Sequence, residues 1–289
     1  MKPEKQQDAV ATCLEGNLYL KRDDYRVYAE HLSKHLGLVL TEDDLDDRDV
    51  AEIFYRALTE RLRGFHEQPT RDNIEALRGD LGILSEYLWT NPCRIGFLAR
   101  TLDREYSLET HTVNCVFIGL GLRVMYAGRD LERLELNSLA LGLAVHDIGM
   151  LRVPDFIKDK PSVLMHSDRQ TMKKHPDTGM NMLSRLQVKD PVVEECVLGH
   201  HERINGSGYP GRLKGDQVGF YARICGLADA FCAAIGERPH REGRDVEEAA
   251  RQFYDDPAFD SRQTALLVQL IERRNEDCPL PFVPRQKSE

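Results

Sequence analysis

Apolar residues at helical spacing dominate the chain from about residue 97 onward. Residues three or four positions apart share one face of a helix, whereas strands alternate apolar and polar positions. Strand-like alternation is scarce in this half of the chain. The helical stretches, separated by Gly and Pro, lie around residues 107–127, 134–147, 168–186, 191–201 and 220–236. We therefore predict an all-α domain over residues 97–289.

The first 96 residues have a helical pattern of their own. Amphipathic patterns cover residues 49–65 and 73–89, and a proline follows each of them within four residues. A chain of 289 residues is long enough for two domains. We predict a smaller, mainly helical N-terminal domain over residues 1–96 with a sensory or dimerisation role, so that a homodimer is one expectation. A short hairpin near residues 13–28 is a further expectation.

Composition and charge limit the compartment and the partners. No run approaches the roughly 18 to 20 apolar residues that cross a bilayer, and the start MKPEKQQDAV has no apolar signal segment. We expect a cytoplasmic protein with no membrane partner. A net charge of -9 without a dense Lys/Arg stretch disfavours long nucleic acid. A small phosphate ligand remains compatible, because a metal cluster with a few arginines dominates the local field.

The seven cysteines are scattered along the chain without a CxxC pair. Such spacing is typical of reduced, mostly buried thiols and not of a disulfide framework. We therefore expect reduced thiols at Cys13, Cys93, Cys115, Cys196, Cys225, Cys232 and Cys278.

A histidine and an aspartate close an apolar helical run. His146-Asp147 follows SLALGLAV, so both polar side chains lie at the end of a helix that should be buried. Burying them costs several kcal/mol unless something compensates. Imidazole and carboxylate are both ligands for divalent iron, manganese or zinc. A lone HD dipeptide is weak evidence, however, since a core histidine with a satisfied hydrogen bond also explains it.

Further motifs contain the additional ligand residues that a metal site needs. They contain His111 in LETHTVNC, His175 in KKHPDTG, the pair His200-His201 in LGHHERINGSGYPG, and Asp229 in ICGLADAF. Neighbouring residues of a helix point about 100 degrees apart, so the adjacent histidines suit two ions better than one. The set predicts at least two metal ions. Neither GxSxG nor GxxxxGK[ST] occurs, so serine-hydrolase and NTP-binding sites receive no support.

In these motifs the sequence resembles the HD-GYP phosphodiesterases of bacterial cyclic di-GMP signalling, a branch of the HD superfamily of metal phosphohydrolases. The resemblance covers roughly residues 97–275 and rests on HDIG, VPDFIKDKP, HPDTG, HHERINGSGYPGRLKGD, ARICGLADAF and ERPHR in that order. It implies an all-helical HD domain that hydrolyses cyclic di-GMP, with iron as the expected metal, manganese as an alternative, and zinc or nickel less favoured.

The resemblance also assigns roles to individual residues. It makes Asp147 the bridging carboxylate and, with His146, the catalytic pair. The implied metal ligands are His111, His146, Asp147, His175, His200, His201 and Asp229. The positions that face the guanine nucleotide and its phosphates are Tyr209, Arg238 and Arg241. The NGSGYPG loop is the expected contact surface for a diguanylate cyclase (GGDEF) partner.

The chain departs from the family pattern at the substrate phosphate. Met150 stands where the family usually has a lysine that reaches this phosphate. An apolar side chain neither donates a proton nor offsets phosphate charge, so a loss of roughly 10²-fold in rate is ordinary if the lysine acts as a general acid.

A second departure concerns the number of metals. Ser107 lies one turn before His111, where family members with a third metal usually have glutamate, and Glu109 should point to another face of the helix. We therefore expect two metals and, as product, the linear dinucleotide pGpG.

Three further substitutions lie near the motifs. Cys232 and Asn205 each replace a usual aspartate, and such outer partners of metal ligands can matter 10- to 100-fold. His240 stands where tyrosine is common. Outside the motifs, His31, His35 and His66 are expected on exposed polar helices, without a metal role.

Three alternatives stay open. The chain could bind metals and cyclic di-GMP with little or no hydrolysis, because Met150 removes a catalytic partner. It could hydrolyse another cyclic dinucleotide such as cyclic GMP-AMP, since the motifs do not reveal the purine contacts. It could also serve as an interaction platform for diguanylate cyclases, with either an active or an inactive site.

Overall fold

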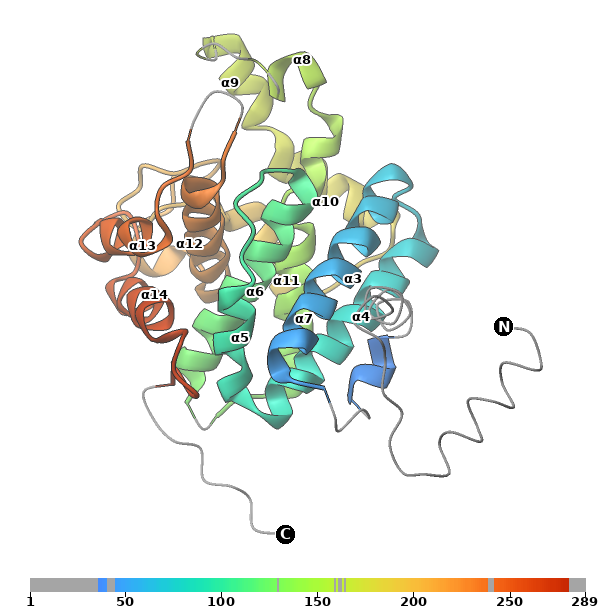
Figure 1. The fold of residues 1–289 in the computed structure, drawn as a ribbon. Coiled ribbons are helices and arrows are strands. Elements are labelled where there is room, and N and C mark those ends of the chain that lie inside the picture. The colour runs from blue at the N-terminus through green and yellow to red at the C-terminus, as the bar shows by residue number, and fades with distance from the viewer. Residues whose placement is uncertain are drawn as a thin grey trace, which may run out of the picture.

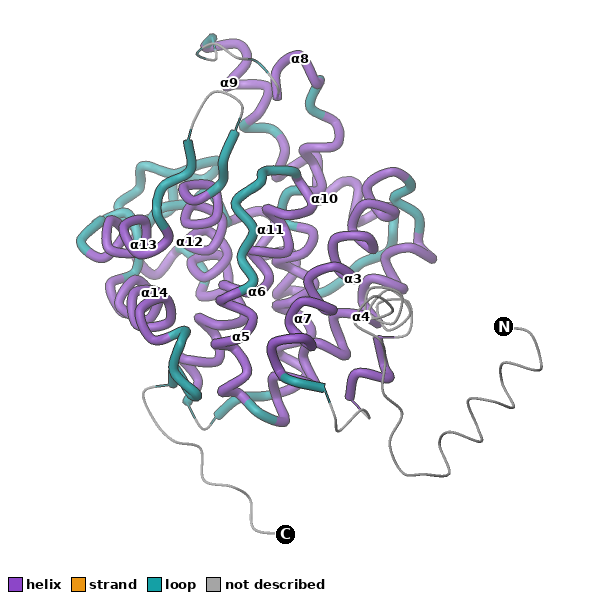
Figure 2. The backbone as a smooth tube through the Cα atoms, viewed as in Figure 1, coloured by secondary structure: helices purple, strands orange, loops and turns teal. Residues whose placement is uncertain are grey.

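The computed structural model describes residues 36–40, 45–128, 130–158, 160, 163, 165–238 and 242–280. All regular elements in these ranges are helices, joined by loops and two isolated β-bridges (Figures 1 and 2). The α-helices are α3 (Asp47–Glu67), α4 (Arg71–Thr90), α5 (Ile95–Arg100), α6 (Leu108–Ala127), α7 (Arg133–Val145), α8 (Asp155–Lys158), α9 (His166–Met172), α10 (His175–Arg185), α11 (Pro191–Gly199), α12 (Phe220–Ile235), α13 (Val246–Tyr254) and α14 (Ser261–Arg273). The 3-10 helices are η1 (Leu36–Leu40), η2 (Pro92–Arg94), η3 (Ile148–Arg152) and η4 (Gly215–Gln217). The predicted all-α class is confirmed, whereas the hairpin expected near residues 13–28 lies outside the described residues.

Capping residues explain where the first helices begin. The side chain of Asp46 accepts a hydrogen bond from the Arg48 amide at the start of α3, and that of Thr70 accepts one from the Asn73 amide at the start of α4. Both caps satisfy amides that have no partner inside the helix. The two helices match the predicted stretches 49–65 and 73–89.

One predicted helix was wrong. Residues 168–186 form two helices, α9 and α10, with Lys173 and Lys174 between them. Pro176 lies in the first turn of α10, where backbone amides have no partner within the helix, so the lack of an N–H group at proline removes no hydrogen bond. Further inside a helix it would remove one. The break places His175 at the very start of α10.

Helix α6 is the centre of the molecule and is buried on all sides. Of its 20 residues, 15 are buried, and α3, α5, α7, α12 and α14 surround it (Figure 1). A side-chain carbon added at Gly119 would lie 2.5 Å from Leu143 of α7, and one at Gly121 would lie 2.6 Å from Leu270 of α14. These glycines therefore let α6 approach its neighbours closely.

The described part of the first 96 residues packs on the rest of the chain. Helix α3 packs against α6 and α4 packs against α7, and one continuous hydrophobic core extends from Leu36 to Leu280. That residues 1–96 form a separate domain with a sensory or dimerisation role stays a prediction.

One stretch passes a length and apolarity test for a membrane helix, contrary to the expectation that no run would approach it. It covers Arg133–Arg152, has a mean hydropathy of 1.2 and is 61% buried inside the structure. Core helices of soluble proteins pass the same test. Because the stretch packs against neighbouring helices and contains His146 and Asp147, it is the core helix α7 followed by η3.

The expectation that all cysteines are reduced was wrong for one pair. Cys93, in η2, and Cys278, after α14, form a disulfide across 185 residues of sequence. The sequence offered no paired spacing because only the packing of α5 against α14 brings η2 near the chain that follows α14. The other cysteines in the described part of the chain are free and buried, as expected, and Cys13 lies outside it.

A partly buried ion pair links α6 to α7. Arg123, 8% exposed, donates from Nε to Glu135 Oε1 at 2.5 Å and makes a second contact to Oε2. The Tyr221 hydroxyl also donates to Glu135, at 2.7 Å. The carboxylate therefore ties α6, α7 and the start of α12 together.

We expect Glu135→Gln to lower the free energy of unfolding by about 3 kcal/mol, because it leaves the Arg123 charge buried without its counterion. Denaturant unfolding measures this. The matched control is Glu86→Gln. Glu86 lies 2.7 Å from Arg133, whose side chain is exposed, so this variant should lower the free energy of unfolding by less than about 1 kcal/mol. Equal small effects for both variants would contradict the assigned role of the Arg123–Glu135 pair.

Candidate metal centre

Five segments bring the predicted ligands to one place. His111 lies in the first turn of α6, His146 and Asp147 directly follow α7, and Asp229 lies on α12. His175 begins α10, and His200 and His201 follow the end of α11. All seven predicted ligands thus lie together, and their role as ligands stays a prediction.

The ligand atoms form two groups that share one carboxylate. Within each group, one donor atom from every residue lies within 4.8 Å of the others. The first group is Asp147, His175, His200 and His201, and the second is His111, His146, Asp147 and Asp229.

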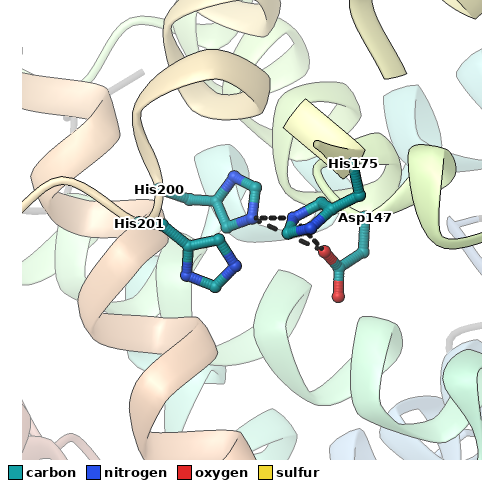
Figure 3. A group of neighbouring side chains, drawn as sticks. All are labelled: Asp147, His175, His200 and His201. Atoms are coloured by element: carbon teal, nitrogen blue, oxygen red, sulfur yellow. Dashed lines mark hydrogen bonds and ion pairs between the residues drawn. The ribbon is translucent and has the colours of Figure 1, made fainter. Parts of the chain in front are cut away.

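The two oxygens of Asp147 face different groups. Its Oδ1 lies 3.1 Å from His175 Nε2 and 3.5 Å from His200 Nε2 (Figure 3). Its Oδ2 lies 3.7 Å from His146 Nε2. This is the arrangement expected of a carboxylate that bridges two cations.

Asp229 completes the second group. Its Oδ1 lies 3.2 Å from His111 Nε2 and 4.0 Å from His146 Nε2, whereas its Oδ2 lies 3.8 Å from His201 Nδ1. Asp229 therefore also faces both groups.

Backbone carbonyls orient three of the imidazole rings. A carbonyl only accepts hydrogen bonds, so each Nδ1 must carry the proton, and Nε2 of the neutral ring keeps its lone pair for a metal. The bonds run from His146 to Leu143 O at 2.7 Å, from His175 to Met172 O at 2.7 Å, and from His200 to Cys196 O and Val197 O at 3.0 Å.

The same tautomers leave the centre of the site in need of positive charge. His175 Nε2 and His200 Nε2 lie 3.0 Å apart, and two facing lone pairs repel unless a cation or a proton lies between them. His146 Nε2 is buried and has no hydrogen-bond partner. Divalent metal ions fit these residues, because they accept every one of these lone pairs.

Burial and charge set the protonation states that metal binding requires. Burial lowers the pKa of His146 to about 4 and that of His201 well below its ordinary value, so both rings are neutral at neutral pH. Burial by itself would raise the pKa of Asp147, but the surrounding histidines outweigh it and hold this pKa well below its ordinary value, so the carboxylate is ionised. Neutral imidazoles and carboxylates are the forms that bind metals.

A glycine brings two of these segments into contact. A side-chain carbon at Gly149 would lie 1.9 Å from the carbonyl oxygen of His175 and 2.8 Å from the Gly179 amide nitrogen. Only glycine therefore lets η3 lie directly on the start of α10. This contact sets the distance between Asp147 and His175.

A basic cavity lies beside the histidine cluster. Its volume is about 490 Å³. The Tyr209 ring stacks on His201 at 4.6 Å between centroids, and Lys173 Nζ lies 5.0 Å from the centroid of Tyr209. The lining residues are Gln170, Lys173, Lys174, Gly206, Ser207, Gly208, Tyr209, Pro210 and Arg212. The sequence analysis missed its three cations, although a Lys pair before His175 and an arginine after the GYPG segment could have indicated them.

A buried glutamate holds the loop that carries Tyr209. Glu202 is 4% exposed and accepts hydrogen bonds from the Gly211 and Leu213 amides. The sequence did not indicate this role, because a buried structural glutamate and a solvent-exposed one look alike in sequence. The one available signal was the position of Glu202 directly after His201.

The remaining predicted substrate residues lie at different places. The Arg238 guanidinium lies 4.0 Å from the Tyr106 ring centroid, and that ring lies 5.7 Å from the His111 ring. Met150 lies in η3, partly buried. Arg241 and His240 lie outside the described residues.

The residues before His111 have other tasks. The Ser107 side chain caps α6 by accepting a hydrogen bond from the Thr110 amide at 3.0 Å. Glu109 lies 2.7 Å from Nδ1 of His66, and this contact lowers its pKa to about 2. The expectation that His66 is exposed was wrong, since its side chain is only 8% exposed. His31 and His35 lie outside the described residues.

We expect Gly149→Ala to reduce the metal content per chain by at least half, because the added carbon would push η3 away from His175. Elemental analysis after gel filtration measures this, with circular dichroism to show that the helices persist. Gly82→Ala in α4 is the control, since no atom lies within 4 Å of the added carbon. It should keep the metal and raise stability by about 0.5–1 kcal/mol. Full metal content in Gly149→Ala would contradict the contact's role.

Comparison with known proteins gives relatives that match parts of the chain. A Thermotoga maritima protein named cyclic di-GMP phosphodiesterase is 38% identical over 135 residues, which are 44% of this chain and 36% of that protein. A Vibrio cholerae protein named 3'3'-cGAMP-specific phosphodiesterase 2 is 36% identical over 109 residues, 37% of this chain and 21% of that protein. The chain thus covers well under half the length of these relatives.

A solved structure and a family model extend the comparison. The structure of Bd1817, an HDG"Y"P protein from Bdellovibrio bacteriovorus, matches with a TM-score of 0.70 at 19% identity over 88% of this chain and 82% of that chain, which shows a common fold. The family model for the HD domain matches residues 102–258, more than half of the chain and all seven predicted ligands. The chain therefore belongs to the HD domain family.

Proposed function

We propose that this chain hydrolyses a 3',5'-phosphodiester bond of cyclic di-GMP on a centre of two divalent metal ions and releases linear pGpG. The observation that carries the proposal is the pair of ligand groups that share Asp147. Membership of the HD family implies divalent metal binding. The name of the Thermotoga maritima relative supports cyclic di-GMP as the substrate.

The geometry suggests how the ligands divide. Asp147 Oδ1 with His175, His200 and His201 would hold one ion, whereas Asp147 Oδ2 with His111, His146 and Asp229 would hold the other. Ions held there would lower the pKa of a bound water toward about 7 and would polarise the phosphoryl group, whose phosphorus atom the resulting hydroxide attacks. Iron is the proposed metal and manganese the alternative, since both accept imidazole and carboxylate.

The chain's own residues would bind and orient the nucleotide. Cyclic di-GMP carries two phosphates, and Lys173, Lys174 and Arg212 line the cavity beside the ligands. The Tyr209 ring, fixed by its stacking on His201, offers a flat face at the same cavity. Arg238, and Arg241 by resemblance, would contact the nucleotide from the His111 side.

The proposal is tested by metal content and hydrolysis on one anaerobically purified sample. We expect about two iron or manganese ions per chain and formation of pGpG. Asp147→Ala should lose most of the metal and all turnover, because it removes an oxygen from both groups. Full activity in Asp147→Ala, or hydrolysis by metal-free protein, would overturn the proposal.

The alternative that the chain binds cyclic di-GMP with little or no hydrolysis rests on Met150, which neither donates a proton nor contributes charge. We expect Met150→Lys to raise kcat by about 10-fold or more, since a positioned acid contributes roughly 10²- to 10⁴-fold in favourable cases. Single-turnover hydrolysis measures this. Met150→Leu is the control and should leave kcat unchanged. An unchanged kcat in Met150→Lys would remove this explanation for low activity.

A second candidate substrate is cyclic GMP-AMP, which the name of the Vibrio cholerae relative favours. Hydrolysis of both cyclic dinucleotides under one set of conditions separates the two. We propose the other partners only as expectations from the resemblance: a diguanylate cyclase at the NGSGYPG loop, a homodimer, and a sensory role for residues 1–96.

A further inference from the structure

A thiol lies beside the ligands of the second group. Cys115 follows His111 by four residues on α6 and is fully buried. Its Sγ lies 3.5 Å from His111 Nε2. His111, Cys115 and His146 form a third group of donor atoms that all lie within 4.8 Å of one another.

The spacing of these atoms matches that of two ligands on one ion. Metal–nitrogen bonds of about 2.0–2.1 Å and a metal–sulfur bond of about 2.3 Å place nitrogen and sulfur of adjacent ligands about 3.1 to 3.6 Å apart, for angles from about 90° to tetrahedral. The observed separation is 3.5 Å. His146 Nε2, which belongs to the same group, is buried without a hydrogen-bond partner. The group therefore has both the spacing of a ligand set and an unsatisfied donor atom.

Packing alone does not distinguish Cys115 from the other buried cysteines. A buried free cysteine usually acts as a small apolar side chain, and Cys196, Cys225 and Cys232 are buried as well. Cys115 differs from these three in lying within a group of metal-ligand atoms. A metal ion deprotonates a coordinating thiol outright, so binding of the ion would itself supply the thiolate.

We propose that Cys115 is a thiolate ligand of the ion that Asp147, His111, His146 and Asp229 would hold. The inference rests on the proposed metal centre and adds a ligand to it. On binding, the S–H bond breaks, the proton passes to water, and a sulfur lone pair forms the bond to the ion without any oxidation. A soft sulfur ligand favours zinc and ferrous iron over manganese. Cys115 thus biases this half of the centre against manganese.

Cobalt substitution tests the ligand directly. The full chain is stripped with chelator, reloaded anaerobically with Co²⁺ in a phosphine reductant, and analysed for cobalt per chain and for near-ultraviolet thiolate-to-cobalt charge transfer. We expect about two cobalt ions and a charge-transfer band, which Cys115→Ser abolishes and the buried control Cys225→Ser keeps.

Each other outcome has a definite meaning. Two bound cobalt ions without the band, or a band that persists in Cys115→Ser, would overturn the inference and leave the metal centre intact. Failure of the wild-type chain to bind cobalt would overturn both. If Cys115→Ser does not fold, X-ray absorption of the zinc-loaded wild type decides, since coordination requires a sulfur at about 2.3 Å from zinc.

Metal competition gives a second readout. We expect Cys115→Ser to weaken zinc binding roughly tenfold or more while manganese affinity changes little, because oxygen replaces the soft donor. Cys225→Ser should change neither affinity. An equal loss for both metals in Cys115→Ser would indicate a packing role and overturn the inference.

Discussion

An apolar helix that ends in His146 and Asp147 shapes the whole centre. Helix α7 is buried along most of its length, so His146 is fully buried and Asp147 is largely enclosed, with its side chain 15% exposed. Uncompensated polar groups there would cost several kcal/mol each. Backbone carbonyls accept hydrogen bonds from Nδ1 of His146, His175 and His200, and the Nε2 lone pairs of these rings point toward the centre of the site. A divalent ion bound there would therefore also stabilise the folded state.

Close helix packing makes this convergence possible. Gly119 and Gly121 let α6 approach α7 and α14, and Gly149 lets η3 lie on α10. As a result, segments that are more than 100 residues apart in sequence, such as His111 and Asp229, lie within 3.2 Å of each other. Most of the predicted ligands lie at helix ends and Asp229 lies within α12, so the packed helices set their geometry.

The centre is asymmetric in its surroundings. On the His201 side, Tyr209 and a cavity with three cations face the solvent. On the His111 side, the neighbours are the buried thiols of Cys115 and Cys232 and the Tyr106 ring, over which the Arg238 guanidinium lies. The first side therefore offers an open basic surface, whereas the second is lined mainly by buried groups.

The helical class, most helix positions and the residues that meet in the centre follow from the sequence, through local periodicity and chemically distinctive side chains. The bridging position of Asp147 was expected only from the family resemblance, and nothing in the sequence indicated that Glu202 holds the Tyr209 loop. Nor could the sequence reveal the Cys93–Cys278 disulfide or the contact between Cys115 and His111. Helical spacing indicates which face of its helix a residue occupies, but not which distant helix packs against that face. Contacts between residues of such distant helices depend on tertiary packing, so they became visible only in the three-dimensional structure.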